Sequence, residues 1–234
     1  MEVNQISGFH SFIESFDFSS LLNILLTLFA SLLCITLHEL SHGYVAYMLG
    51  DNTAKNAGRL SFNPLRHIDV TGFIMMLVLQ VGWAKPVPVD YFNLRKPKRD
   101  MALVALAGPL SNVIITVVFL FLYGALYIPF AGTAFGGMFL SLAQRVAYIS
   151  LGFAVFNLLP FPPLDGAKIL FSFLRDEHYE MLMKYEGYGS LILFVLMLTG
   201  SFSYPVAVVR QLIYNEFAVV AQFACDLIAI MFYI

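Results

Sequence analysis

Residues 21–50 read LLNILLTLFASLLCITLHELSHGYVAYMLG, and this stretch decides how the chain folds. A membrane-spanning helix needs about 20 predominantly apolar residues. The run from Leu21 to Leu37 is apolar almost throughout, and the helical pattern continues beyond it. We therefore predict a spanning helix that begins near Leu21, continues through the HELSH sequence and ends at Gly50.

Residues 38–42 of this helix form the motif His-Glu-x-x-His. Positions i and i+4 of a helix lie on one face, so the imidazoles of His38 and His42 can bind a single Zn²⁺. Glu39 then lies near the metal without binding it, where it can take a proton from the attacking water. A polar patch where the helix leaves the membrane is the alternative, but it does not explain two histidines at ligand spacing.

The composition places the whole chain in a membrane. Of 234 residues, 59% are hydrophobic and only 12% are charged, and the mean hydropathy is +0.79. Soluble domains have about 25% charged residues, so a water-exposed surface could not be covered by this chain. The net charge of −2 gives no reason to expect a nucleic-acid partner. The expected partner is therefore the lipid bilayer.

Further apolar segments predict further spans. They lie at about 101–128, at about 138–159, around LILFVLMLTG (191–200), and in the tail 205–234, which Arg210, Asn215, Glu216 and Asp226 interrupt. We expect residues 1–234 to form a single integral membrane domain, with a core at 21–175 and C-terminal helices at 189–234.

The segment between the first two spans is mixed in character. GFIMMLVLQVGWA (72–84) is apolar but short, which favours a re-entrant or interfacial hairpin over a full span. GRLSF (58–62) and AKPVPV (84–89) have the alternation and prolines of short edge strands. The predicted fold is an all-α polytopic membrane protein of about five to six transmembrane helices, with a short re-entrant or β-hairpin element near the HELSH motif.

Basic residues predict the orientation, because loops rich in Lys and Arg stay in the cytoplasm. Segments 1–20, 129–137 and 199–209 contain none, whereas 51–100 contains eight and 166–188 contains Lys168, Arg175 and Lys184. We therefore expect a multi-pass protein of the cell membrane with its N-terminus outside. The two basic segments and the candidate site would then face the cytoplasm.

A catalytic zinc needs a third protein ligand and an open position for water. The candidate is Asp165 in the sequence NLLPFPPLDG (157–166), where three prolines stop the preceding helix and Gly166 allows the backbone to turn. The predicted topology puts Asp165 and His42 at cytoplasmic ends of their helices. Asp69 is the next candidate for this role. His67, in NPLRHID, is either a residue near the site or a structural hydrogen-bonding histidine.

HELSH followed about 120 residues later by NLLPFPPLDG resembles the site-2 protease family of intramembrane zinc metalloproteases. GRLSFNPLRHID (58–69), GWAKPVPV (82–89) and RDMALVALAGPLSN (99–112) resemble its compact prokaryotic members. Ser41 stands where glycine is frequent in the family, and Ala167 follows the Asp-Gly pair where a second glycine is common. Neither position is a ligand, and the length leaves room for neither of the PDZ and CBS domains of larger members.

The resemblance implies one Zn²⁺ per chain, held by His38, His42 and Asp165, with Glu39 as general base. It also implies that Asn112 of AGPLSN lines the site and stabilises the oxyanion. The substrate would be a transmembrane protein whose helix locally unwinds, and AKPVPV could pair with the unwound strand. The rival interpretation is a non-catalytic metal-binding membrane scaffold or a transporter. Transporters often show paired halves, which this sequence lacks, and a dead scaffold has no need of Glu39.

Overall fold

The computed structural model describes residues 18–79, 83–177, 179, 184 and 186–233. The elements in these residues are helical: α2 (Phe18–Met48), α3 (Thr53–Asn56), η1 (Pro64–Arg66), α4 (Val70–Leu79), η2 (Tyr91–Asn93), α5 (Pro97–Phe130), α6 (Ala134–Asn157), α7 (Asp165–Phe171), α9 (Glu186–Leu198) and α10 (Ser203–Tyr233). The prediction of an all-α polytopic membrane protein is confirmed.

Four helices in the described residues, α2, α5, α6 and α10, are long and apolar enough to cross a membrane. The sequence predicts about five to six. The difference lies in α9, which contains the LILFVLML run but has only 13 residues. At about 1.5 Å per residue such a helix is roughly 20 Å long, short of the roughly 30 Å hydrocarbon core. The helix ends before Gly200, whose φ of 70° turns the chain.

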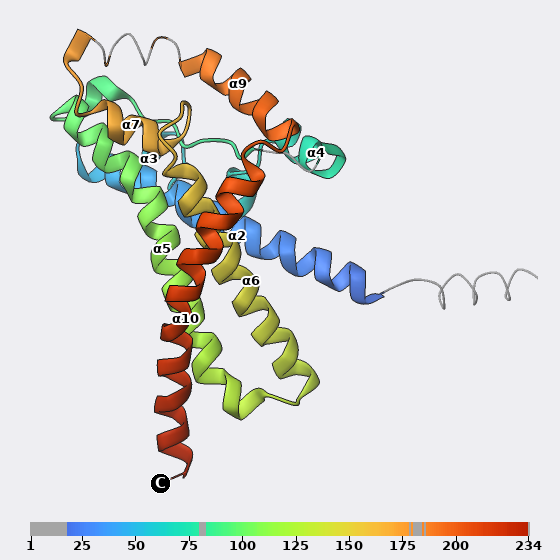
Figure 1. Cartoon of the computed structure of the whole chain (residues 1–234). Helices are drawn as coiled ribbons and strands as arrows, with labels where there is room; N and C mark the ends of the chain where they lie inside the picture. Colours follow the sequence, from blue (N-terminus) through green and yellow to red (C-terminus); the bar gives the residue numbers. More distant parts are fainter. Residues whose placement is uncertain (1–17, 80–82, 178, 180–183, 185, 234) are drawn as a thin grey trace, which may run out of the picture.

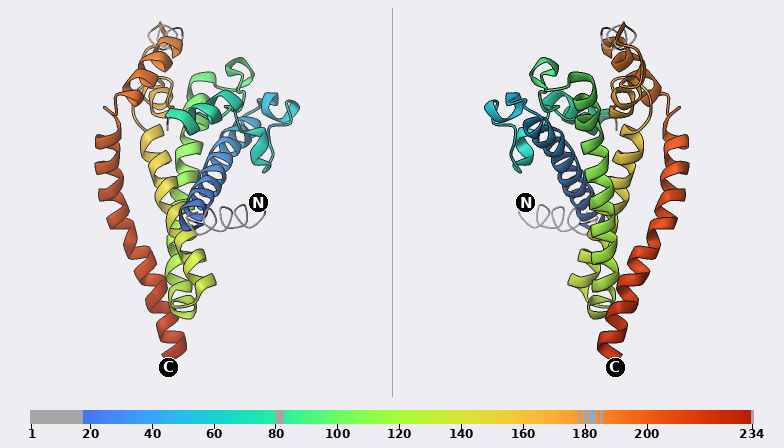
Figure 2. Two further views of the ribbon diagram at one scale, coloured as in Figure 1. Left: turned by 90° about the vertical axis from the view of Figure 1, so that its right-hand side faces the viewer. Right: turned by 90° about the vertical axis from the view of Figure 1, so that its left-hand side faces the viewer.

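α5, α6 and α10 run along the long axis of the molecule, and α2 crosses them at a steep angle (Figures 1 and 2). α5 and α6 are antiparallel and joined by a short turn, and α2 packs against both. α10 lies along α5 in the same direction, so closely that a Cβ added to Gly124 would lie 1.9 Å from the carbonyl oxygen of Ala221. It runs antiparallel to α6 (Figure 1), and the Tyr148 ring on α6 contacts Tyr214 on α10. α3, α4, α7 and α9 all lie at one end of this bundle, which we call the loop-rich end.

The path of α9 changes the predicted topology. Phe194 of α9 contacts Trp83, and Phe202, just before α10, contacts Phe161 in the loop that precedes α7. Residues 199–209 therefore begin at the loop-rich end, and α10 carries the C-terminus to the opposite end (Figure 2). The expectation that 199–209 lies on the other side of the membrane from 51–100 is wrong, because α9 is too short to cross.

The two predicted edge strands are also wrong. Within the described residues the only bridge is an isolated antiparallel one between Ile68 and Ala84. Pro86 and Pro88 lack backbone N–H groups, so residues 84–89 cannot build a continuous ladder. Nearby contacts hold the segment instead, and the guanidinium of Arg59 donates to the Lys85 carbonyl at 2.7 Å. α4 is confirmed as too short to span, while residues 80–82 of this segment lie outside the described residues.

A buried carboxylate organises the chain that follows α2. Asp51 is completely buried and accepts hydrogen bonds from the backbone N–H groups of Thr53 and Asp90 and from the side-chain amide of Asn93. Burial alone would raise the pKa of Asp51, but these hydrogen bonds outweigh it and hold that pKa below its ordinary value. Asp51 thus fastens the segment before α5 to the end of α2.

Apolar side chains both fill the bundle and cover its outside. Ala30, Cys34, Ile115 and Val146 form a buried cluster between α2, α5 and α6. Large apolar side chains on the outer faces of the four long helices are exposed, including Ile24, Phe29, Ile114, Phe121, Val219 and Phe223. Such an apolar exterior is stable only against lipid. Two arginines of these helices have partners on a neighbouring helix: Arg145 donates to Asn23 and Thr27 of α2, and Arg210 stacks on Tyr148 of α6.

Candidate active site

The two histidines of the HELSH motif face the interior of the bundle. His38 and His42 are both buried, and their Nε2 atoms lie 3.0 Å apart. Their rings meet edge to face with centroids 4.5 Å apart. The helical spacing of four residues therefore brings both imidazoles to one point, as predicted.

Asp165 reaches the same point from α7, of which it is the first residue. Its Oδ2 atom lies 3.3 Å from Nε2 of His38 and 3.2 Å from Nε2 of His42. Gly166 makes this approach possible, because a Cβ there would lie 2.3 Å from the Leu158 carbonyl oxygen. Burial would raise the pKa of Asp165, but the neighbouring His42 and His38 hold it well below its ordinary value.

These three residues fit a zinc ion. One possible ligand atom from each of His38, His42 and Asp165 lies within 4.8 Å of the other two. Oδ2 of Asp165 is buried and accepts no hydrogen bond. Ligands at the usual zinc bond lengths of about 2.0–2.1 Å occupy a tetrahedron with edges of roughly 3.3–3.4 Å. The observed separations of 3.0–3.3 Å are close to such edges. Two imidazoles and a carboxylate leave one tetrahedral position open.

Helix α5 forms the wall behind the histidines. A Cβ on Gly108 would lie 2.4 Å from Nε2 of His42 and 2.6 Å from Cε1 of His38, so only glycine allows α5 to pass this close. Nδ1 of His42 lies 2.7 Å from the carbonyl oxygen of Val104, one turn earlier on α5. One turn later, the completely buried amide of Asn112 lies 3.1 Å from Nδ1 of His38. Asn112 therefore contacts a histidine of the metal group, as a residue lining the site should.

Glu39 lies beside the metal group and is held from another element. Its Oε2 atom accepts a hydrogen bond of 2.8 Å from the backbone N–H of Val87. Val87 stands between Pro86 and Pro88, which have no N–H of their own to donate. The AKPVPV segment, which the sequence predicts to pair with substrate, thus uses one of its few backbone N–H groups to bind Glu39.

The two other candidates have structural roles. Asp69 accepts from the N–H of Gly72 at the start of α4 and does not belong to the metal group. His67 is almost completely buried, and its Nε2 lies 2.9 Å from the carbonyl oxygen of Ser61. This contact is the one expected of a structural hydrogen-bonding histidine. Gly108 and Val104 were not singled out from the sequence. The AGPLSN motif contains Gly108, but nothing in the sequence says which glycine of an apolar helix faces a histidine.

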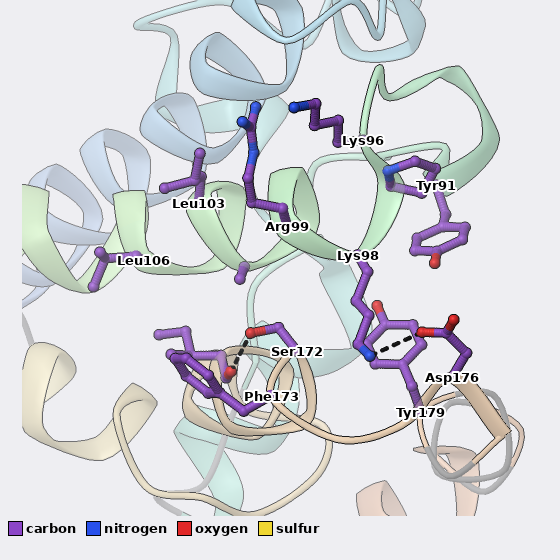
Figure 3. A pocket seen from close by; sticks show the side chains of 13 residues that line it. Tyr91, Lys96, Lys98, Arg99, Leu103, Leu106, Ser172, Phe173, Asp176 and Tyr179 are labelled. Carbon is purple, nitrogen blue, oxygen red and sulfur yellow. Dashed lines mark hydrogen bonds and ion pairs between the residues drawn. The ribbon is translucent and has the colours of Figure 1, made fainter.

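A cavity lies elsewhere, between the start of α5 and the segment from α7 to Tyr179 (Figure 3). It has a volume of about 780 Å³ and contains neither the histidines nor Asp165. Lys98 crosses it to pair with Asp176 at 2.9 Å, while Leu103 and Leu106 form its apolar side. The metal group of His38, His42 and Asp165 instead lies between α2, α5 and α7.

Comparisons with known proteins agree with this site. A sequence profile of the family described as "Peptidase family M50" matches residues 26–200. A protein of Bacillus subtilis (strain 168) named "Putative zinc metalloprotease YwhC" is 39% identical over 175 residues, covering 72% of this chain and 78% of that one. Rip2 of Mycolicibacterium smegmatis, which has the same description, is 31% identical over 173 residues, covering 72% of this chain and 64% of Rip2.

A third relative comes from an archaeon. MJ0611 of Methanocaldococcus jannaschii, again described as a zinc metalloprotease, is 32% identical over 160 residues, which cover 68% of this chain and 76% of that one. No solved structure matches the chain. The matched family region includes His38, His42 and Asp165, and the names of the relatives identify the metal as zinc. The chain belongs to peptidase family M50, the site-2 protease family, and is a membrane zinc metalloprotease.

Proposed function

We propose that this protein hydrolyses peptide bonds of membrane-spanning protein substrates, with His38, His42 and Asp165 holding one zinc ion. The observation that carries the proposal is that these three side chains converge inside a bundle whose outer surface is apolar. A site between two spanning helices, α2 and α5, is accessible to a substrate segment that itself lies in the membrane. A segment entering it must unwind locally, because its carbonyl groups are hydrogen-bonded while it is helical.

Zinc in this site would supply a Lewis acid that acidifies water and polarises the scissile carbonyl. Glu39 would act as general base, taking the proton of the attacking water on the carboxylate oxygen that Val87 does not hold. The same carboxyl would then donate that proton to the leaving amine nitrogen. The hydrogen bond from the Val87 N–H fixes the orientation of the Glu39 carboxylate, and it leaves the carboxylate charged. Oxyanion stabilisation by Asn112 stays a prediction.

The test is a cleavage assay with purified protein and a panel of single-span substrates, with and without a chelator. Glu39→Gln should abolish cleavage while zinc content stays equal to that of the wild type, because Glu39 is a base and not a ligand. Glu216→Gln is the matched control, since it makes the same chemical change at an exposed position of α10. Full activity in Glu39→Gln would refute the mechanism, and loss of zinc from it would make Glu39 a ligand.

We further propose that the protein lies in the cell membrane with the loop-rich end in the cytoplasm. The charge pattern supports this side, since the described parts of the basic segments 51–100 and 166–188 lie at that end, while the turn after α5 has no Lys or Arg. Single cysteines at Ala57 and Ala131, two exposed alanines at opposite ends, test the proposal in a background without Cys34 and Cys225.

An impermeant thiol reagent added to intact cells should label the cysteine at position 131 and spare the one at position 57. Met231→Cys adds a test of α10, because the structure places the end of this helix beside the turn after α5 and away from α7. It should be labelled like position 131. Labelling of position 57 alone would invert the proposed orientation. Labelling of 131 without 231 would instead contradict the path of α10.

A further inference from the structure

A small buried polar network lies behind His38, on the side away from Asp165. Asn112, Thr116 and Ser150 are each completely buried. The hydroxyl of Ser150, on α6, lies 2.9 Å from the backbone carbonyl oxygen of Asn112 and 3.3 Å from the atom drawn as its amide oxygen Oδ1. Thr116 donates to the same backbone carbonyl at 2.9 Å. Since no water reaches these groups, each hydrogen must find its acceptor within the network.

The hydrogen bonds of His42 fix which of its nitrogens is free. A carbonyl oxygen can only accept, so Nδ1 of His42, 2.7 Å from the Val104 carbonyl, must carry the proton. Its Nε2 then has a lone pair directed at the metal position. For His38 to bind the same ion through Nε2, its Nδ1 must likewise carry a proton and needs an acceptor. The group within reach is the amide of Asn112, which the structure draws with Nδ2 at 3.1 Å from Nδ1 of His38 and with Oδ1 toward Ser150.

Only one orientation of that amide provides an acceptor. The oxygen and nitrogen of an asparagine amide have nearly the same shape, so their assignment follows from hydrogen bonding. With Oδ1 toward His38, the oxygen accepts from Nδ1–H and the nitrogen Nδ2 donates to the Ser150 hydroxyl, which in turn donates to the Asn112 backbone carbonyl. With Nδ2 toward His38, Nδ1 must accept. The proton then lies on Nε2, which cannot bind a metal.

We propose that Ser150 is a positioning residue: its hydroxyl holds the Asn112 amide so that the oxygen faces His38, which keeps Nε2 of His38 free to bind zinc. The proposal rests on the metal site proposed above. It also assigns Asn112 a role through His38, and this role needs no contact with the oxyanion. Loss of an outer partner of a metal-binding histidine typically lowers metal affinity about 10–100-fold.

The readout is zinc affinity of the purified full-length protein, measured by competition with a chromophoric chelator. Ser150→Ala should weaken zinc binding by about tenfold or more. Thr116→Val is the matched control, because it removes a hydroxyl that binds the same backbone carbonyl but does not touch the amide. It should keep wild-type affinity. Thermal unfolding of both variants separates a loss of zinc affinity from a loss of fold.

Asn112→Leu removes the acceptor altogether and should weaken binding at least as much as Ser150→Ala. Asn112→Asp tests the orientation of the amide itself. Both oxygens of a carboxylate accept hydrogen bonds, so Ser150 is no longer needed to turn an acceptor toward His38. Ser150→Ala should therefore lower zinc affinity far less in the Asn112→Asp background than in the wild type. Equal effects in the two backgrounds, or equal effects of Ser150→Ala and Thr116→Val, would overturn the proposal.

His38→Ala distinguishes this failure from failure of the metal site. If His38→Ala lowers zinc affinity while Ser150→Ala and Asn112→Leu do not, the site stands and the positioning role of Ser150 is refuted. If His38→Ala leaves zinc affinity unchanged, the proposed ligand set is wrong, and with it the reason for a positioning residue.

Discussion

A methyl group at Gly108 should damage the active site directly. In the Gly108→Ala variant the new Cβ would lie 2.4 Å from Nε2 and 2.5 Å from Cε1 of His42, and 2.6 Å from Cε1 of His38. Carbon atoms in favourable contact are about 3.5–4.0 Å apart, so the rings or α5 must retreat by roughly 1 Å. Zinc sites tolerate deviations of only about 0.2 Å in ligand distances. We therefore expect zinc affinity to fall by at least about tenfold.

Catalysis should suffer at least as much, because a misplacement of about 1 Å can lower a rate about 10²-fold. Zinc affinity by chelator competition and cleavage of a single-span substrate measure the two effects separately. Gly137→Ala is the matched control, since it makes the same change in helix α6, where a Cβ would meet nothing within 4 Å. Zinc affinity and cleavage equal to the wild type in Gly108→Ala would refute the inferred contact between α5 and the histidines.

Three further predictions concern the third ligand, the segment after α2, and α10. Asp165→Ala should lower zinc content, because two histidines alone rarely hold a catalytic zinc, whereas Asp69→Ala should leave it unchanged; the opposite result in a metal analysis would exchange their roles. Asp51→Asn should lower the free energy of unfolding by about 2 kcal/mol at pH 7, since hydrogen bonds to a charged group are lost. The folded pKa of Asp51 lies below its unfolded value of about 3.9. The stability lost in Asp51→Asn should therefore be fully present above about pH 4 and vanish as the pH falls through the folded pKa. A stability loss that does not depend on pH in thermal unfolding would contradict the role given to the Asp51 carboxylate. Gly124→Leu should lower the thermal stability and detach α10, because its side chain would overlap the backbone of Ala221; unchanged stability would mean that the two helices do not pack there.

The sequence by itself determined the environment and the chemistry of the protein. So few charged residues and such long apolar runs can be stable only in lipid, whatever the packing. The face shared by His38 and His42 follows from helix geometry alone, so this part of the site needed no tertiary information. Glu39 followed from the same motif. Asp165 followed from its acidic side chain beside a helix end, and the resemblance to a known family made its role explicit.

The tertiary structure decided everything that depends on contacts between distant segments. The spacing of an apolar run does not say whether it crosses the membrane, and only the short length of α9 as folded places the start of α10 beside Phe161. Residues 84–89 alternate like a strand, yet they find no partner strand and use Val87 to hold Glu39. Ser150 has no signal in the sequence, because it is one small polar residue in an apolar helix. Its importance comes from lying beside Asn112, and that contact exists only once α6 packs against α5.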